Sequence, residues 1–252
     1  MRRLLIRPGA IGDCILSLPE LESHSLKSPD YTEIWAPRPI LPLIQFADRT
    51  RAIADTRLDL VGVIEKFIPP ELAGFDSIYS WYGSNNPDFR EAVRHLPFTF
   101  FPALPINVTG VPRIKVPAAP IENFAVIHPF SGSANKNWPL DSYQAVAAAL
   151  DMPVKFCLGP EDQLAPRMKE VIRIDHLYDL ACLLSTSRLF IGNDSGITHL
   201  AAAVGIPTIA IFLSTDPRIW APRGDHVTVL DHPSVDSVVR AAQSRARPLV
   251  RS

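Results

Sequence analysis

The sequence predicts an α/β protein with two parallel sheets, each covered by helices on both faces. Short apolar segments alternate with helical patterns along most of the 252 residues, and this alternation is typical of parallel sheets that are buried on both faces. A stretch with six prolines, from Pro97 to Pro120, separates two such blocks and marks the best candidate domain boundary. Open parallel sheets bind ligands beyond the carboxyl ends of their strands, and the polar, glycine-containing segments of this chain follow predicted strands.

The first block begins with a buried strand at residues 3–7, followed by a turn and a helix that starts at Asp13. An apolar stripe runs along this helix, but Pro19 should kink it or end it early. The other predicted elements of this block are strands at residues 31–36 and 77–82 and helices at residues 40–47 and 87–96. Residues 53–75 carry no pattern that assigns them to a helix or a strand.

After the proline-rich stretch, strands and helices alternate regularly. The predicted strands are residues 124–128, 154–158, 189–192, 208–213 and 227–230. The predicted helices are residues 140–150, 164–172, 177–184, 195–204 and 235–245. We therefore predict one domain at residues 1–112 and a second at residues 113–252, facing each other across a cleft.

Composition and charge exclude several classes of protein. Apolar residues make up 47% of the chain and charged residues 20%, which excludes a disordered protein. Lys and Arg together number 25 against 26 Asp and Glu, so an extended nucleic-acid surface is not expected. Cys14, Cys157 and Cys182 lie far apart and form neither a disulfide framework nor a zinc motif. No signal peptide or membrane span is predicted, so we expect a cytoplasmic protein with peripheral membrane contacts at most.

Residues 7–13 are the first segment with a candidate chemical role. Gly9 and Gly12 would let the backbone of this strand-to-helix loop turn tightly and approach a ligand at the cleft. Asp13 would stand in the first turn of the helix. Its ordinary role there is to cap the helix, which is the better interpretation of so short a match taken alone, and the alternative is a role in chemistry.

Residues 128–139 form a second loop after a buried strand. Ser131, Ser133 and the backbone amides of this loop could bind phosphate oxygens, and Lys136 could add a positive charge. The alternative is a surface loop with a solvated lysine. We interpret Trp138 as structural, packing where the next helix begins.

The third segment, residues 193–203, opens a helix whose free backbone N–H groups near Ser195 and Gly196 would form an anion site. Asp194 would be either the N-cap of this helix or an acceptor for ligand hydroxyls. His199, one turn into the helix, is most simply a buried histidine bonded to a carbonyl. Glu161, at another strand end, would either contact ribose hydroxyls or lie solvated in its loop.

In this order and spacing the segments resemble the family 9 glycosyltransferases, the lipopolysaccharide heptosyltransferase family. The likeness is carried by residues 7–13, by the Lys-x-Trp-Pro ending of residues 128–139, and by residues 193–212. The resemblance implies two Rossmann-like domains of the GT-B type, with a nucleotide-sugar donor on the second domain and an acceptor on the first. The sequence departs from the family at Phe130, where a glycine is usual. Its first block is also shorter than the usual first domain of the family.

The resemblance also implies roles for individual residues. Asp13 would be the general base, Lys136 and Ser131 would bind the donor diphosphate, and Glu161 would contact the ribose. The donor-binding helix start would comprise Asp194, Ser195, Gly196 and His199. Displacing a nucleoside diphosphate from the anomeric carbon of a sugar needs a base for the acceptor hydroxyl and stabilisation of the charge on the leaving phosphate. Closure of the two domains would exclude water from the reaction.

The function expected from the resemblance is an inverting glycosyltransferase that uses no cofactor and no obligatory metal. Its donor would be a nucleotide-diphosphate sugar similar to ADP-heptose, and its acceptor a glycolipid or cell-surface glycan at the inner face of the inner membrane. Two alternatives remain open: a non-catalytic nucleotide-sugar binding protein, and a GT-B-like nucleotide-sugar epimerase.

Overall fold

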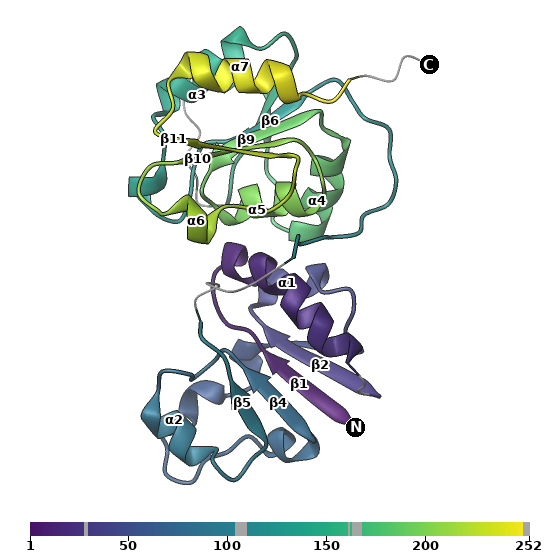
Figure 1. The fold of residues 1–252 in the computed structure, drawn as a ribbon, viewed down its shortest axis with the longest axis vertical. Coiled ribbons are helices and arrows are strands. Elements are labelled where there is room, and N and C mark those ends of the chain that lie inside the picture. The colour runs from purple at the N-terminus through teal and green to yellow at the C-terminus, as the bar shows by residue number, and fades with distance from the viewer. Residues whose placement is uncertain (28–29, 104–109, 161, 163–167, 249–252) are drawn as a thin grey trace. The chain divides into compact units, whose positions relative to one another are not determined.

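The computed structural model describes residues 1–27, 30–103, 110–160, 162 and 168–248. The chain forms two units, Met1–Gly110 and Val111–Ser252, and each contains one parallel sheet flanked by helices (Figure 1). The predicted α/β fold class with two parallel sheets is therefore confirmed. Within the described residues, no helix combines the length and the apolar character needed to cross a membrane.

The first unit is built on a five-stranded sheet with the order β3-β2-β1-β4-β5. Its strands are β1 (Arg2–Ile6), β2 (Tyr31–Ala36), β3 (Arg49–Ala52), β4 (Ser77–Ser80) and β5 (Phe98–Phe100). Helix α1 (Ile11–Leu26) and the short helix α2 (Pro87–Ala92) flank it, and 3-10 turns occupy Arg38–Leu43, Ile53–Asp55, Leu58–Leu60 and Pro70–Gly74. Leu4 and Ile6 of β1 pack with Trp35 and Phe89 in one apolar core, because alternate residues of a strand share a face.

Helix α1 differs from its prediction at both ends. It begins at Ile11, so Gly12 lies inside the helix and makes no turn, and the prediction of Gly12 as a loop glycine was wrong. The helix also continues through Pro19 to Leu26. Proline removes one backbone hydrogen bond, but Ile15, Leu16 and other residues of the same helix are fully buried, and this packing keeps the helix continuous.

Two strands of the first unit, β3 and β5, were not predicted. Both lie at edges of the sheet, beside β2 and β4 respectively. The predicted helix at residues 40–47 is instead the 3-10 turn Arg38–Leu43, since Pro39 and Pro42 interrupt the donors that an α-helix needs.

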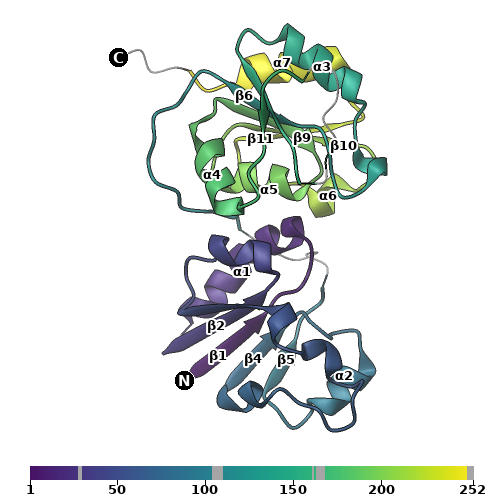
Figure 2. The same cartoon turned by 180° about the vertical axis from the view of Figure 1, so that it is seen from behind.

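The second unit has a six-stranded sheet with the order β11-β10-β9-β6-β7-β8. Its strands are β6 (Ala125–His128), β7 (Val154–Cys157), β8 (Val171–Ile172), β9 (Leu189–Asn193), β10 (Thr208–Phe212) and β11 (Val227–Asp231). Its helices are α3 (Leu140–Ala149), α4 (Leu177–Thr186), α5 (Gly196–Ala203), α6 (Pro217–Trp220) and α7 (Val235–Arg245). Helices α3 and α7 cover one face of this sheet, and α4 and α5 cover the other (Figures 1 and 2).

One predicted helix of the second unit was wrong where it can be compared. Residues 164–167 of the predicted helix at 164–172 lie outside the described residues, but Val171–Ile172 form strand β8, paired with β7. Leu158 donates its backbone N–H to the Ile172 carbonyl at 3.0 Å, so these residues extend the sheet edge.

Both sheets have a strand order that reverses at an internal strand pair. In the first unit the chain starts at β1 and builds outward on both sides, through β2 and β3 and then through β4 and β5. In the second unit the equivalent pair is β6 and β9. Ligands of open parallel sheets bind beyond the carboxyl ends of the strands at such a switch point, so the loops after β1, β6 and β9 are the places to examine.

Candidate functional site

At the switch point of the second unit, an ion pair joins the loops that follow β6 and β9. The Lys136 ammonium lies 2.7 Å from Oδ2 of Asp194, although the two residues are 58 positions apart. Asp194 directly follows β9, and Lys136 ends a 3-10 turn in the loop after β6. The structure therefore brings together two residues that the sequence analysis predicted for one site.

Asp194 is the centre of a cluster formed with Lys136, His199 and Thr215, which we call the Asp194 cluster. Thr215 donates its hydroxyl to Oδ2 of Asp194 at 2.7 Å, and Nε2 of His199 lies 3.8 Å from Oδ1. Burial alone would raise the pKa of the Asp194 carboxyl, but interactions with His199, Lys136 and Thr215 outweigh it and lower the pKa to about 2. Asp194 is therefore a fixed negative charge at neutral pH.

The Lys136 ammonium keeps part of its hydrogen-bonding capacity for another group. An ammonium has three N–H donors, and Asp194 is the acceptor that the described residues provide for one of them. The Lys136 side chain is 31% exposed, whereas that of Asp194 is 6% exposed. Asp194 thus anchors the ammonium from the buried side, while part of the Lys136 side chain stays accessible.

The start of α5 adds backbone donors close to this ion pair. Ser195, and not Asp194, is the N-cap: its hydroxyl accepts the N–H of Thr198 at 3.3 Å. The N–H groups of Gly196 and Ile197 have no partner among the described residues, which is the usual state of a helix start and suits an anion. Asp194 therefore interacts through side chains and does not cap the helix.

Gly192 allows α5 to lie close to β9. A Cβ atom at this position would come within 2.8 Å of Oγ1 of Thr198 and of the Phe190 ring. The Thr198 hydroxyl also donates to the Asn193 carbonyl. Glycine is required because a side chain would push the helix start away from the strand end.

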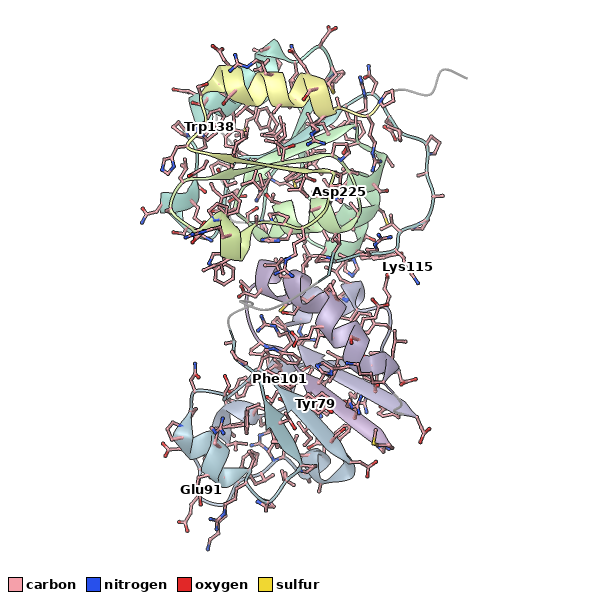
Figure 3. The ribbon with its side chains drawn as sticks, viewed as in Figure 1. Tyr79, Glu91, Phe101, Lys115, Trp138 and Asp225 are labelled. Atoms are coloured by element: carbon pink, nitrogen blue, oxygen red, sulfur yellow. The ribbon has the colours of Figure 1, made fainter. Side chains whose placement is uncertain are left out.

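The loop after β6 is held from inside by its own polar groups. The Ser131 hydroxyl lies 2.7 Å from Oδ1 of Asn137 and 2.8 Å from the Ser133 carbonyl, so it is engaged within the loop. Trp138 is buried and packs edge-on against Tyr143 at 5.1 Å, on the side of the sheet that carries α3 and α7 (Figure 3). This agrees with its interpretation as a structural residue. Glu161 lies outside the described residues.

In the first unit, the loop after β1 holds Asp13 in a defined position. Oδ2 of Asp13 accepts the N–H of Ala10 at 2.9 Å, so this carboxylate does cap α1. Oδ1 has no partner among the described residues and the side chain is half-buried, so one oxygen remains free to accept a proton. Gly9 has a φ of +124°, and a Cβ there would come within 2.9 Å of Oδ2. Gly9 is therefore required both by its conformation and by the nearby carboxylate.

Arg7 supports the same loop through hydrogen bonds, and it was not among the predicted site residues. Its guanidinium is 2% exposed and donates to the Ser17 hydroxyl at 2.8 Å and to the Pro8 carbonyl at 3.0 Å. A longer bond of 3.3 Å reaches the Asp13 carbonyl. Burial lowers the pKa of Arg7. The arginine thus fixes both ends of the segment that carries Asp13.

Thr215 and Asn193 were also missed as site residues. Thr215 follows β10, so the rule that ligands bind beyond strand ends could have identified its loop. Asn193 is the first residue of the segment at residues 193–203, but no role was predicted for it. In the part of the chain that the structure describes, no group of three or more His, Cys, Asp and Glu residues could hold a metal ion.

Comparison with known proteins connects this arrangement to one family. Residues 112–248 match the family described as glycosyltransferase family 9 (heptosyltransferase). Lipopolysaccharide heptosyltransferase 3 of Escherichia coli is 32% identical over 116 residues, covering 40% of this chain and 34% of that protein. The core heptosyltransferase OpsX of Haemophilus influenzae is 27% identical over 111 residues, covering 38% and 32%. The matched region thus spans about a third of these relatives' length.

Solved structures share the fold over nearly the whole chain. ADP-heptose heptosyltransferase II of E. coli superposes with a TM-score of 0.73 at 15% identity, covering 97% of this chain and 98% of that one. E. coli heptosyltransferase WaaC with ADP gives 0.71 at 16% identity, covering 98% and 100%. A family 9 glycosyltransferase of Veillonella parvula gives 0.74 at 17% identity, covering 96% of each chain. At these identities the likeness establishes the fold, which is the GT-B fold that the sequence predicted.

Proposed function

Because the chain belongs to glycosyltransferase family 9, we propose that it transfers a sugar from a nucleoside-diphosphate sugar to a glycan or glycolipid acceptor. One observation carries the assignment. The loops after β6 and β9, at the switch point of the second sheet, place an ammonium and the open N–H groups of a helix start around one location. Such a set of donors fits a diphosphate.

The reaction assigns different roles to the two units. An acceptor hydroxyl oxygen attacks the anomeric carbon of the donor sugar and passes its proton to the free oxygen of Asp13. The bond between that carbon and the diphosphate breaks, and the leaving nucleoside diphosphate takes the electron pair. Lys136 and the N–H groups of Gly196 and Ile197 stabilise the negative charge that grows on it. Attack opposite the leaving group inverts the anomeric centre.

The donor we propose is ADP-heptose or a close relative. Support comes from neighbours of the same fold whose structures contain ADP or ADP-2-deoxy-2-fluoro heptose. Asp194 is itself anionic, so it would repel a phosphate and is suited to fix Lys136 and accept a sugar hydroxyl. The acceptor we propose is a lipopolysaccharide-type glycolipid at the inner membrane face, by analogy with the named relatives. The chemistry above needs no metal, so transfer should persist with a chelator present.

The decisive experiment separates donor binding from chemistry. Titration calorimetry with ADP should show that Lys136→Ala weakens binding by more than about tenfold, while Lys169→Ala, which removes an exposed lysine of the same unit, changes nothing. Asp13→Asn should abolish transfer from ADP-heptose and leave ADP affinity intact. Asparagine keeps a carbonyl oxygen to accept the Ala10 N–H, so the helix cap survives and only the base is lost.

A matched control for Asp13 is Asp88→Asn, because Asp88 also lies in the first turn of a helix of the first unit and is exposed. Equal ADP affinity of Lys136→Ala and the parent protein would remove Lys136 from the site. Full turnover of Asp13→Asn would refute the base assignment. ADP binding without transfer to any glycolipid acceptor would favour a non-catalytic binding protein, and conversion of the donor without an acceptor would favour an epimerase.

A further inference from the structure

Asn193, the last residue of β9, is fully buried and makes hydrogen bonds with both ends of the loop that carries Lys136. Its Oδ1 accepts the backbone N–H of Trp138 at 2.9 Å and the hydroxyl of Tyr143 at 2.8 Å. Its Nδ2 donates to the carbonyl of Pro129 at 2.7 Å and lies 3.4 Å from Oδ1 of Asn137. The exposed fraction of Asn193 is 0%.

The chemistry of these partners fixes the orientation of the amide. A backbone N–H can only donate and a backbone carbonyl can only accept, so the oxygen of Asn193 must face Trp138 and its nitrogen must face Pro129. The asparagine amide offers two acceptor sites on its oxygen and two donors on its nitrogen without a change of protonation. An aspartate would place a second oxygen against the Pro129 carbonyl, and a leucine would leave three buried polar groups without partners.

The two ends that Asn193 holds define the position of the segment between them. Pro129 is where the chain leaves β6, and Trp138 is where it enters α3, so residues 130–137, including Lys136, are suspended between two bonds to one side chain. The residue that follows the end of β9, Asp194, binds the ammonium of Lys136 at 2.7 Å. One strand end therefore fixes both the loop and its functional side chain.

We propose that Asn193 is the positioning residue of the donor site, holding the loop after β6 in register with the end of β9 so that Lys136 meets the diphosphate. We call the hydrogen bonds of Asn193 with Pro129, Trp138 and Tyr143 the clamp. The predicted effect of the clamp on ligand binding rests on the proposed function, but the clamp can be observed without any ligand. Asn193 contacts no substrate in this proposal and acts through Lys136.

Three variants test the clamp. Asn193→Asp keeps the size and the acceptor for Trp138 and Tyr143 but loses the donor to Pro129. Tyr143→Phe removes one donor to Asn193 without changing the packing and covers the case in which the first variant does not fold. The control is Thr208→Val, because Thr208 is 1% exposed and donates to the Ile206 carbonyl at 2.9 Å at the opposite end of the same sheet.

Hydrogen exchange without ligand is the first measurement. Asn193→Asp should accelerate exchange at residues 131–138 while strands β6 and β9 stay protected, and Tyr143→Phe should do so more weakly. Thr208→Val should leave this loop unchanged. Unaltered protection of residues 131–138 in both Asn193→Asp and Tyr143→Phe would overturn the inference whatever the protein binds.

A double-mutant cycle with ADP as the probe is the second measurement. Asn193→Asp and Lys136→Ala should each weaken ADP binding by about tenfold, and the double variant should bind no more than about twofold worse than Lys136→Ala alone, since both remove the same interaction. Multiplied losses would show that Asn193 does not act through Lys136 and would overturn the inference. If Asn193→Asp accelerates exchange at residues 131–138 but neither Asn193→Asp nor Lys136→Ala changes ADP affinity, the role of Asn193 in holding the loop is supported and the proposed donor site is wrong.

Discussion

Replacing Asp194 with asparagine tests whether the Asp194 cluster stabilises the second unit through a charged carboxylate. Its pKa is lowered from 3.8 to about 2, and this difference corresponds to about 2 kcal/mol of stability at neutral pH. A carboxyl whose pKa is lower in the folded state contributes this stability above the unfolded value of 3.8. The contribution is lost as the pH falls toward 2, and by pH 3 roughly 1 kcal/mol of it should be gone.

The assay is urea unfolding of the parent protein and of Asp194→Asn at several pH values, followed by tryptophan fluorescence, to which Trp138, buried in the same unit, contributes. The two proteins share all other titrating groups, so the difference between their unfolding free energies reports the Asp194 charge together with its interactions with Lys136 and His199. We expect the parent to be more stable at pH 6 and its advantage to shrink by about 1 kcal/mol at pH 3. An advantage that stays constant between these pH values would refute the reasoning, because it would mean that the carboxylate charge contributes nothing.

Three further substitutions probe the loops around the two strand ends. Gly9→Ala should lower the transfer rate and leave ADP affinity unchanged, because the new Cβ meets the Asp13 carboxylate at 2.9 Å; steady-state kinetics beside calorimetry checks this, and unchanged turnover contradicts it. Gly192→Ala should destabilise the second unit by about 1–3 kcal/mol and weaken ADP binding, because the new Cβ would displace α5. An unchanged midpoint of urea unfolding would argue against the close approach of α5 to β9. Arg7→Met should destabilise the first unit by about 1–3 kcal/mol, because the buried hydrogen bonds of Arg7 are lost. A melting temperature equal to that of the parent protein would contradict this role.

The central strands of both sheets were predictable because they are buried on both faces. Strand β2 matches its predicted range, and β6 and β10 differ from theirs by one residue at one end. The edge strand β11 also matches its prediction within one residue, whereas the edge strands β3, β5 and β8 were not predictable in the same way. Strand β3 reads Arg-Thr-Arg-Ala, and it is held by backbone pairing with β2 and by contacts such as the ion pair of Arg51 with Glu71. A strand with only one neighbour has no need of a continuous apolar sequence.

Lys136, Asp194 and His199 were predicted as members of the candidate site, whereas Thr215, Asn193 and the contacts among these residues were not. Lys136 and Asp194 each stood out as polar residues behind a strand, and only the fold could bring them within 2.7 Å. The sequence left open whether Asp194 or a neighbour caps α5, because both Asp and Ser are good N-caps, and the structure assigns the cap to Ser195. Asn193 carries no charge and is fully buried, so its importance depends on four partners that are distant in sequence.

The pairing of Lys136 with Asp194 has a consequence for how a ligand would be captured. Opposite charges at 2.7 Å cancel each other beyond a few ångströms, so this ion pair attracts an approaching anion only weakly. Association with ADP should therefore depend only weakly on ionic strength, unlike the steering seen at clefts lined by one sign of charge. The affinity for ADP would therefore depend mainly on short-range hydrogen bonds from Lys136 and from the N–H groups of Gly196 and Ile197.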